Sequence, residues 1–72
     1  MPRADAIARL DKDYGEHAIG MGLSPDGRAL YELFVGDGGT WTMLVTRTDK
    51  ISCIAAAGNG WQGNPLATGE GT

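Results

Sequence analysis

The chain has 72 residues, so it holds at most one domain, and 42% hydrophobic with 21% charged residues is typical of a folded globular domain rather than a disordered segment. A formal net charge of -3 supplies no basic surface for phosphates, which argues against binding to nucleic acid or to anionic membranes. No apolar run approaches the roughly 18 to 20 residues that cross a bilayer, so no membrane insertion is expected.

The first predicted element is an amphipathic helix over about residues 3–14. Ile7, Leu10 and Tyr14 recur at steps of three and four residues, which places them on one side of a helix. Gly15 can adopt the left-handed conformation that ends a helix. Because a helix of about three turns is marginal alone in water, its apolar side requires cover from the rest of the chain.

Two antiparallel strands follow, joined by a turn at residues 24–27. In residues 18–23 the odd-numbered side chains are large and apolar, whereas the even-numbered ones are Ala or Gly. The turn sequence S-P-D-G suits a type I turn followed by a residue with positive φ. Placing Ser24 opposite Arg28 sets Met21 beside Tyr31, so this register brings the apolar side chains together on one face.

The last two predicted strands are residues 40–46 and 51–57, after a turn at residues 36–39. The first of them alternates large apolar residues with threonines. Pairing the two strands across their own turn sets Val45 beside Cys53. The expected fold class is therefore α+β: one N-terminal amphipathic helix packed on a four-stranded antiparallel meander sheet.

In this fold the domain spans residues 1–61, and residues 62–72 form a flexible, glycine-rich tail. Trp61 is expected to fold back over a sheet edge or the helix end. All four strands offer odd-numbered residues to one side, and we expect the helix to cover that side. The predicted core beneath the helix is Ile19, Met21, Tyr31, Leu33, Trp41, Met43, Val45 and Ile51.

The other face of the predicted sheet carries a candidate interface for a protein partner or a homodimer. Its members are Leu30, Phe34, Leu44 and Ile54. Leu44 lies beside Ile54 on adjacent strands and Phe34 is diagonal to them, so they form one apolar patch. Two alternatives stay open: the tail covers the patch through Trp61 or Leu66, or the face is an ordinary mixed surface.

Two sequence patterns match the letters of known sites without their context. Residues 58–63 read G-x-G-x-x-G, but no helix and no downstream acid follow, so no nucleotide or other cofactor is expected. Residues 11–16 include the three acids Asp11, Asp13 and Glu16, but their spacing does not fit a calcium loop. We interpret these acids as the solvated face and end of the helix, and expect no metal site.

The rival hypothesis is a thiol-dependent enzyme with Cys53 as nucleophile and His17 as base. These are the chain's only thiol and only imidazole, and such chemistry requires contact between them. In a meander His17 begins the first strand and Cys53 lies in the last, at opposite edges. We therefore favour a structural thiol and expect no catalytic residues. A single cysteine also excludes an intrachain disulfide.

Several short motifs together resemble a family of small uncharacterised exported bacterial proteins. They are Y-G-E at residues 14–16, G-T-W-T at residues 39–42 and S-C-I-A-A-A-G at residues 52–58. The resemblance covers about residues 2–61 and implies no assigned activity. It does imply a periplasmic or secreted protein, in which a cysteine upstream of the helix forms a disulfide with Cys53. If Met1 is the natural start, the alternative is a cytoplasmic protein with a reduced thiol.

Members of this family often carry Pro-Asp-Gly in the last hairpin, where this chain has Thr48-Asp49-Lys50. Lys50 therefore occupies a glycine position, and we expect it to adopt a positive φ at a cost of about 1 kcal/mol. Since an apolar outer face is present and a catalytic set is not, the leading hypothesis is a non-enzymatic small exported domain. It binds a protein or self-associates through a sheet face.

Overall fold

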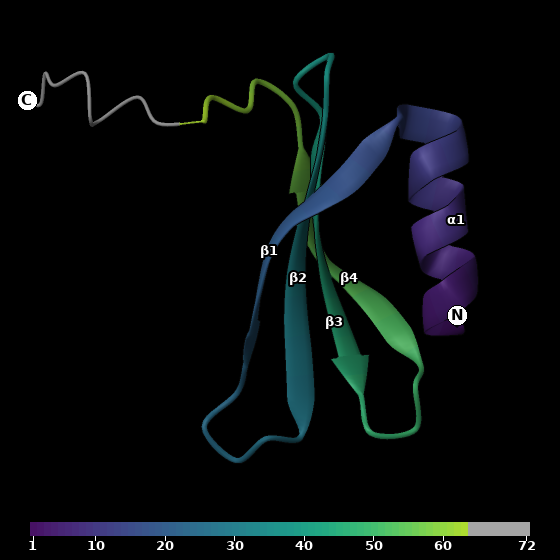
Figure 1. Ribbon diagram of the computed structural model, residues 1–72, viewed down its shortest axis with the longest axis vertical. Coiled ribbons are helices and arrows are strands. Elements are labelled where there is room, and N and C mark those ends of the chain that lie inside the picture. The colour runs from purple at the N-terminus through teal and green to yellow at the C-terminus, as the bar shows by residue number, and fades with distance from the viewer. Residues whose placement is uncertain (64–72) are drawn as a thin grey trace, which may run out of the picture.

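The computed structural model describes residues 1–63 and confirms the predicted α+β architecture. Helix α1 (Arg3–Tyr14) packs against one face of a four-stranded antiparallel sheet with strand order β1-β2-β3-β4 (Figure 1). The strands are β1 (Glu16–Leu23), β2 (Ala29–Gly36), β3 (Trp41–Arg47) and β4 (Ser52–Gly58). Most of the segment for which a flexible tail was predicted, from residue 64 onward, lies outside the described residues.

The two ends of α1 are attached to opposite edges of the sheet. At the C-terminal end Gly15 is left-handed, with φ 62°, and its N–H donates to the carbonyl of Asp11 at 2.9 Å, as expected for a helix stop. This single residue links α1 to edge strand β1. At the N-terminal end the Arg3 N–H donates to the Lys50 carbonyl at 3.0 Å, beside β4. The helix therefore spans the sheet from the β4 edge to the β1 edge, and Figure 1 shows it lying along one face.

The hairpin turns lie where the sequence predicts them, but the first is longer than predicted. Lys50 has φ 66°, so the predicted left-handed residue is present. In the first hairpin the Ser24 N–H donates to the Ala29 carbonyl at 2.8 Å, so the prediction that Ser24 lies opposite Arg28 is wrong by one residue. The Ser24 hydroxyl, which accepts from the Ala29 N–H at 3.1 Å, stabilises this longer turn.

That shift changes the pairing between β1 and β2. Met21 pairs with Glu32 rather than with Tyr31. A β-bulge at Ile19, between Ala18 and Gly20, then restores the predicted pairing register toward the start of β1. Between β3 and β4 the predicted neighbours are confirmed, since Val45 pairs with Cys53 and Leu44 with Ile54. A second bulge shifts the remainder of that ladder, so Trp41 lies opposite Gly58 and not Ala57.

The main correction concerns which face of the sheet α1 covers. The buried apolar core consists of Ala6 and Leu10 from the helix with Phe34 and Leu44 from the sheet. Even-numbered residues of β2 and β3 therefore lie beneath α1, and the prediction that Trp41, Met43 and their odd-numbered neighbours form the core is wrong. The physical reason is that α1 is attached at both ends, through Gly15 to β1 and through Arg3 to Lys50 beside β4. These attachments hold the helix on this face even though the other face is more apolar.

The residues of the predicted interface therefore lie on the face that α1 covers. Phe34 and Leu44 are 2% and 1% exposed, and Leu30 is half-buried at the same side of the sheet. Ile54 lies on the same face but on edge strand β4, where 64% of it is exposed. Phe34 and Leu44 thus pack beneath α1, and Ile54 is the exposed member of the predicted patch.

Candidate functional site

The face of the sheet opposite α1 is covered by no other element among residues 1–63, and we call it the open face. Residues that pair directly in an antiparallel sheet point to the same side. The pairing therefore aligns rows of side chains across β2, β3 and β4 on this face. These rows are Tyr31, Val45 and Cys53; Leu33, Met43 and Ala56; and Val35, Trp41 and Gly58.

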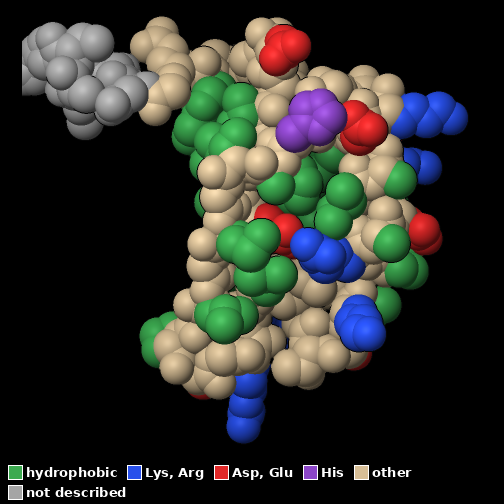
Figure 2. Space-filling model, viewed as in Figure 1, with side chains coloured by type: hydrophobic (Ala, Val, Ile, Leu, Met, Phe, Trp, Pro, Cys, Tyr) green, Lys and Arg blue, Asp and Glu red, His purple; other side chains and the backbone are tan. Residues whose placement is uncertain are grey.

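The centre of the open face is apolar and uncharged. Tyr31 is 44% exposed, and Leu33, Met43 and Val45 are half-buried by their neighbours within the sheet alone. Figure 2 shows the sheet from its β1 edge, with hydrophobic side chains at the surface beside the strands and charged side chains both in the middle of the view and around its outline. This combination of aromatic, methionine and β-branched side chains without charges is typical of the centre of an interface.

Trp61 folds back to the sheet and lies beside Trp41, at one end of the open face. The backbone N–H of Trp61 donates to the Gly39 carbonyl at 2.9 Å. The centroid of its ring lies 6.3 Å from that of Trp41, and the two ring planes are tilted by 53°. The Trp41 indole in turn lies over Gly58, where a Cβ atom would be 3.0 Å from Nε1. The two indoles form a fixed aromatic border beside the apolar rows.

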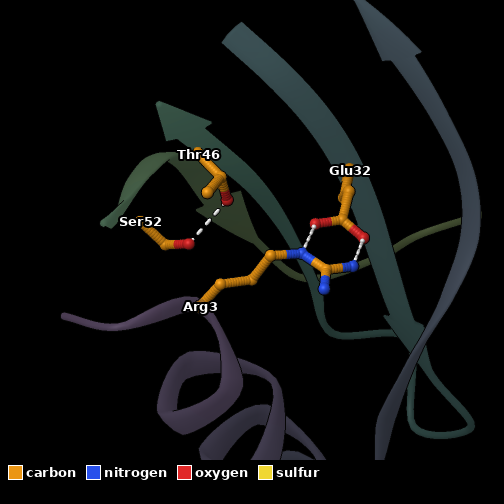
Figure 3. A network of polar contacts seen from close by, with 4 residues as sticks. All are labelled: Arg3, Glu32, Thr46 and Ser52. Atoms are coloured by element: carbon orange, nitrogen blue, oxygen red, sulfur yellow. Dashed lines mark hydrogen bonds and ion pairs between the residues drawn. The ribbon is translucent and has the colours of Figure 1, made fainter. Parts of the chain in front are cut away.

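The face beneath α1 is, by contrast, rich in polar groups. Arg3 extends from the first turn of the helix to Glu32 in the middle of β2 (Figure 3). Its Nε and Nη2 donate to the two carboxylate oxygens at 2.9 and 2.8 Å. Glu32 is 1% exposed, and the hydrogen bond to its carboxylate raises the pKa of Arg3 above its usual value. This bidentate pair fixes the helix N-terminus over the centre of the sheet.

A second polar pair lies close to the first, also in Figure 3. The hydroxyl oxygens of Thr46 and Ser52 are 2.6 Å apart, and both residues are buried at the base of the β3–β4 hairpin. Glu16 and Thr42 are likewise buried on this face. The prediction that Glu16 belongs to a solvated acidic helix end is therefore wrong, because the turn at Gly15 directs it under the helix.

The thiol and imidazole of the enzymatic hypothesis are not brought together. Cys53 is exposed on β4 and His17 is exposed on β1, at opposite edges of the sheet. Three strand spacings alone separate their backbones by about 14 Å. Cys53 also lies farther along the sheet, in the row of Val45 and Tyr31, whereas His17 pairs with Val35. The nearest acid to His17 is Asp11, with Nε2 to Oδ1 at 3.6 Å. This arrangement provides no direct proton transfer from Cys53 to His17.

Within residues 1–63 no group of three or more His, Cys, Asp or Glu side chains is placed to hold a metal ion. No helix in the same part of the chain has the length and apolar character needed to cross a membrane.

No family model, no curated protein and no solved structure matches this chain. The resemblance to small exported bacterial proteins therefore stays a prediction from sequence motifs.

Proposed function

We propose that this chain is a small non-enzymatic interaction domain that self-associates through the open face of its sheet. One observation supports the proposal above all. The helix covers the more polar face, with Glu32, Thr42 and Thr46, and the more apolar face is left without cover in residues 1–63. Exposed apolar faces of this kind mark interaction sites, since leaving them in water is unfavourable.

The preferred occupant of the open face is a second copy of the chain. A two-fold interface brings a surface against itself, so any charge near the axis meets a like charge. The apolar rows avoid this penalty because their central members Leu33, Met43 and Val45 are uncharged. Two such sheets can stack about 10 Å apart with their strands about 30° from parallel, as in β-sandwiches.

Sedimentation velocity over a range of concentrations tests this proposal. The wild type is expected to show a monomer–dimer equilibrium, and Met43→Lys is expected to weaken dimerisation at least about tenfold, since it buries an unpaired charge. Leu23→Lys is the matched control, because Leu23 is 68% exposed but pairs with Leu30 on the helix side. A wild type that stays monomeric near about 1 mM, or equal effects of the two lysines, would contradict the proposal.

We also propose that the domain is exported and that Cys53 forms the disulfide implied by the sequence resemblance. The geometry beside Cys53 supports this. Met1 and Ser52 exchange backbone hydrogen bonds, at 2.7 and 3.3 Å, and Pro2 bridges Ile51 in antiparallel fashion. A residue directly before Met1 in a longer chain would continue this pairing opposite Cys53. Non-hydrogen-bonded pairs of this type have Cα atoms about 4.5 Å apart, which suits a disulfide.

The disulfide has its own test, using a chain extended at its N-terminus. A cysteine placed one residue before Met1 is expected to oxidise with Cys53 and to raise the melting temperature. A cysteine placed two residues before Met1 is the control, because alternation along a strand points it to the other face. Mass spectrometry under non-reducing conditions distinguishes the two, and equal oxidation of both extended chains would count against the proposed pairing.

A further inference from the structure

One carboxylate oxygen of an acid buried under the C-terminal end of α1 has no hydrogen-bond partner among residues 1–63. Glu16 is 2% exposed, and its Oε1 makes no hydrogen bond. A buried carboxylate without a hydrogen-bond partner is costly, so such a group calls for an explanation. Thr40 presents a second buried oxygen, Oγ1, that is also without a partner.

These two oxygens belong to one site because of Gly36, which lies between them in the sheet. Glu16 pairs with Gly36, and the Gly36 N–H donates to the Thr40 carbonyl at 2.9 Å. A Cβ atom on Gly36 would be 3.1 Å from Thr40 Oγ1, 3.2 Å from Glu16 Cγ and 2.8 Å from the carbonyl oxygen of Tyr14. The Tyr14 carbonyl oxygen, the Thr40 hydroxyl and the side-chain stem of Glu16 thus surround one glycine. We call this the Glu16–Thr40 niche.

The Glu16–Thr40 niche opens into a cavity of about 170 Å³. Leu10, Ile54 and Ala57 supply apolar walls, and no Lys, Arg or His is among its lining residues in the described chain. Beside it a larger groove of about 380 Å³ runs between α1 and β4, and it shares Leu10, Tyr14 and Ile54 with the cavity. Arg9 also lines this groove, whereas no basic side chain lines the cavity at Glu16. The site therefore combines an acidic end with an adjoining, mostly apolar groove.

We infer that the Glu16–Thr40 niche binds the ammonium group of a small alkyl amine whose hydrocarbon chain lies in the groove between α1 and β4. An ammonium has donors for several acceptors at once, and the negative end of the helix dipole adds to its attraction. Hard inorganic cations need six or more oxygen ligands, which these apolar walls do not supply. Glu16, Leu10 and Ile54 lie on the helix-covered side of the sheet, and Trp41 and Gly58 line the cavity at its border with the open face.

Titration with n-butylammonium, followed by amide NMR shifts of Glu16, Gly36 and Thr40, tests the inference. The matched probe is 1-butanol, which has a similar shape and no charge. The amine is expected to bind at least about tenfold more tightly, because a hydrogen bond to a buried carboxylate is charge-assisted. Glu16→Gln is expected to abolish this preference, and Asp5→Asn, which makes the same change of net charge on the exposed helix face, is expected to leave it intact.

Thr40→Val provides a second variant that leaves the acid in place. It is expected to weaken amine binding by several-fold while the wild-type circular dichroism spectrum is kept. Equal affinity of the wild type for the amine and the alcohol would overturn the inference, even if Glu16→Gln failed to fold. So would a folded Glu16→Gln variant that kept the preference for the amine.

Discussion

Arg3→Met removes the guanidinium group that pairs with Glu32 and keeps an unbranched apolar side chain. Glu32 is 1% exposed, so the loss of Arg3 leaves its carboxylate buried beneath α1 with neither of the two hydrogen bonds that it now accepts. Breaking a fully buried ion pair costs about 3–5 kcal/mol. The Arg3 side chain is itself 39% exposed, and water already screens part of the pair, so we expect about 2–3 kcal/mol.

Such a loss would be large for this chain, because a domain of this size seldom has more than about 3–5 kcal/mol of net stability. Urea unfolding followed by tryptophan fluorescence measures it directly. Arg9→Met is the matched control on the same helix: Arg9 faces Asp13 at 4.0 Å with both side chains exposed, so its loss should cost no more than about 0.5 kcal/mol. Equal effects of the two substitutions would refute the assigned role of Arg3.

The double variant Arg3→Met, Glu32→Met distinguishes the ion pair from simple packing. If the cost of Arg3→Met comes from an unpaired buried carboxylate, then replacing the carboxylate too should recover most of the lost stability, since apolar residues of similar volume replace buried ion pairs at little cost. If the cost came from lost packing of the Arg3 stem, the double variant would be less stable than either single variant.

The remaining predictions concern turns and close contacts. Gly36→Ala should destabilise the fold by about 1–3 kcal/mol in thermal melts, because its Cβ would lie 2.8 Å from a helix carbonyl oxygen. Gly22→Ala places its Cβ in open space on β1 and should stabilise the fold by about 0.4–1 kcal/mol in the same assay. Lys50→Gly should raise stability by up to about 1 kcal/mol by relieving a positive φ, whereas Lys50→Ala should not. Hydrogen bonds from the Ser24 hydroxyl and a backbone N–H lower the pKa of Asp26, so NMR titration should give a pKa below the ordinary value for Asp. The contribution of Asp26 to stability is present above its unfolded-state pKa and is lost as the pH falls through its lowered folded-state pKa.

The secondary structure could be read from the sequence, and the orientation of the sheet could not. The helix stop at Gly15, the left-handed Lys50 and the pairing of Val45 with Cys53 follow from local patterns that the fold retains. The covered face depends instead on where the two ends of α1 attach, which is a long-range property. One local signal favoured the observed face: Glu32, a charge in the middle of a strand, requires a cation, and Arg3 is the basic residue at the start of the helix.

The longer first turn and a bulge on β4 explain the remaining errors in register, whereas the bulge on β1 restores the predicted pairing toward Glu16. The bulge on β1 lies at Ile19, next to small residues, and the other lies at Ala55, in a run of alanines. Small side chains on both faces give a strand little preference for one register, so a shift costs little there. The buried position of Glu16 follows from the sharp turn at Gly15, whereas its acidic neighbours along the chain indicated a solvated helix end.

The division of the sheet into a polar covered face and an apolar open face has a thermodynamic consequence. Among residues 1–63 the apolar core beneath α1 contains only Ala6, Leu10, Phe34 and Leu44, with Ile7 packed at its margin, so these residues provide little hydrophobic stabilisation. Association of open faces would add stability by mass action, because only the folded chain presents the apolar rows. The melting temperature should then rise with protein concentration, and Met43→Lys should remove that rise while leaving the helix-covered core intact.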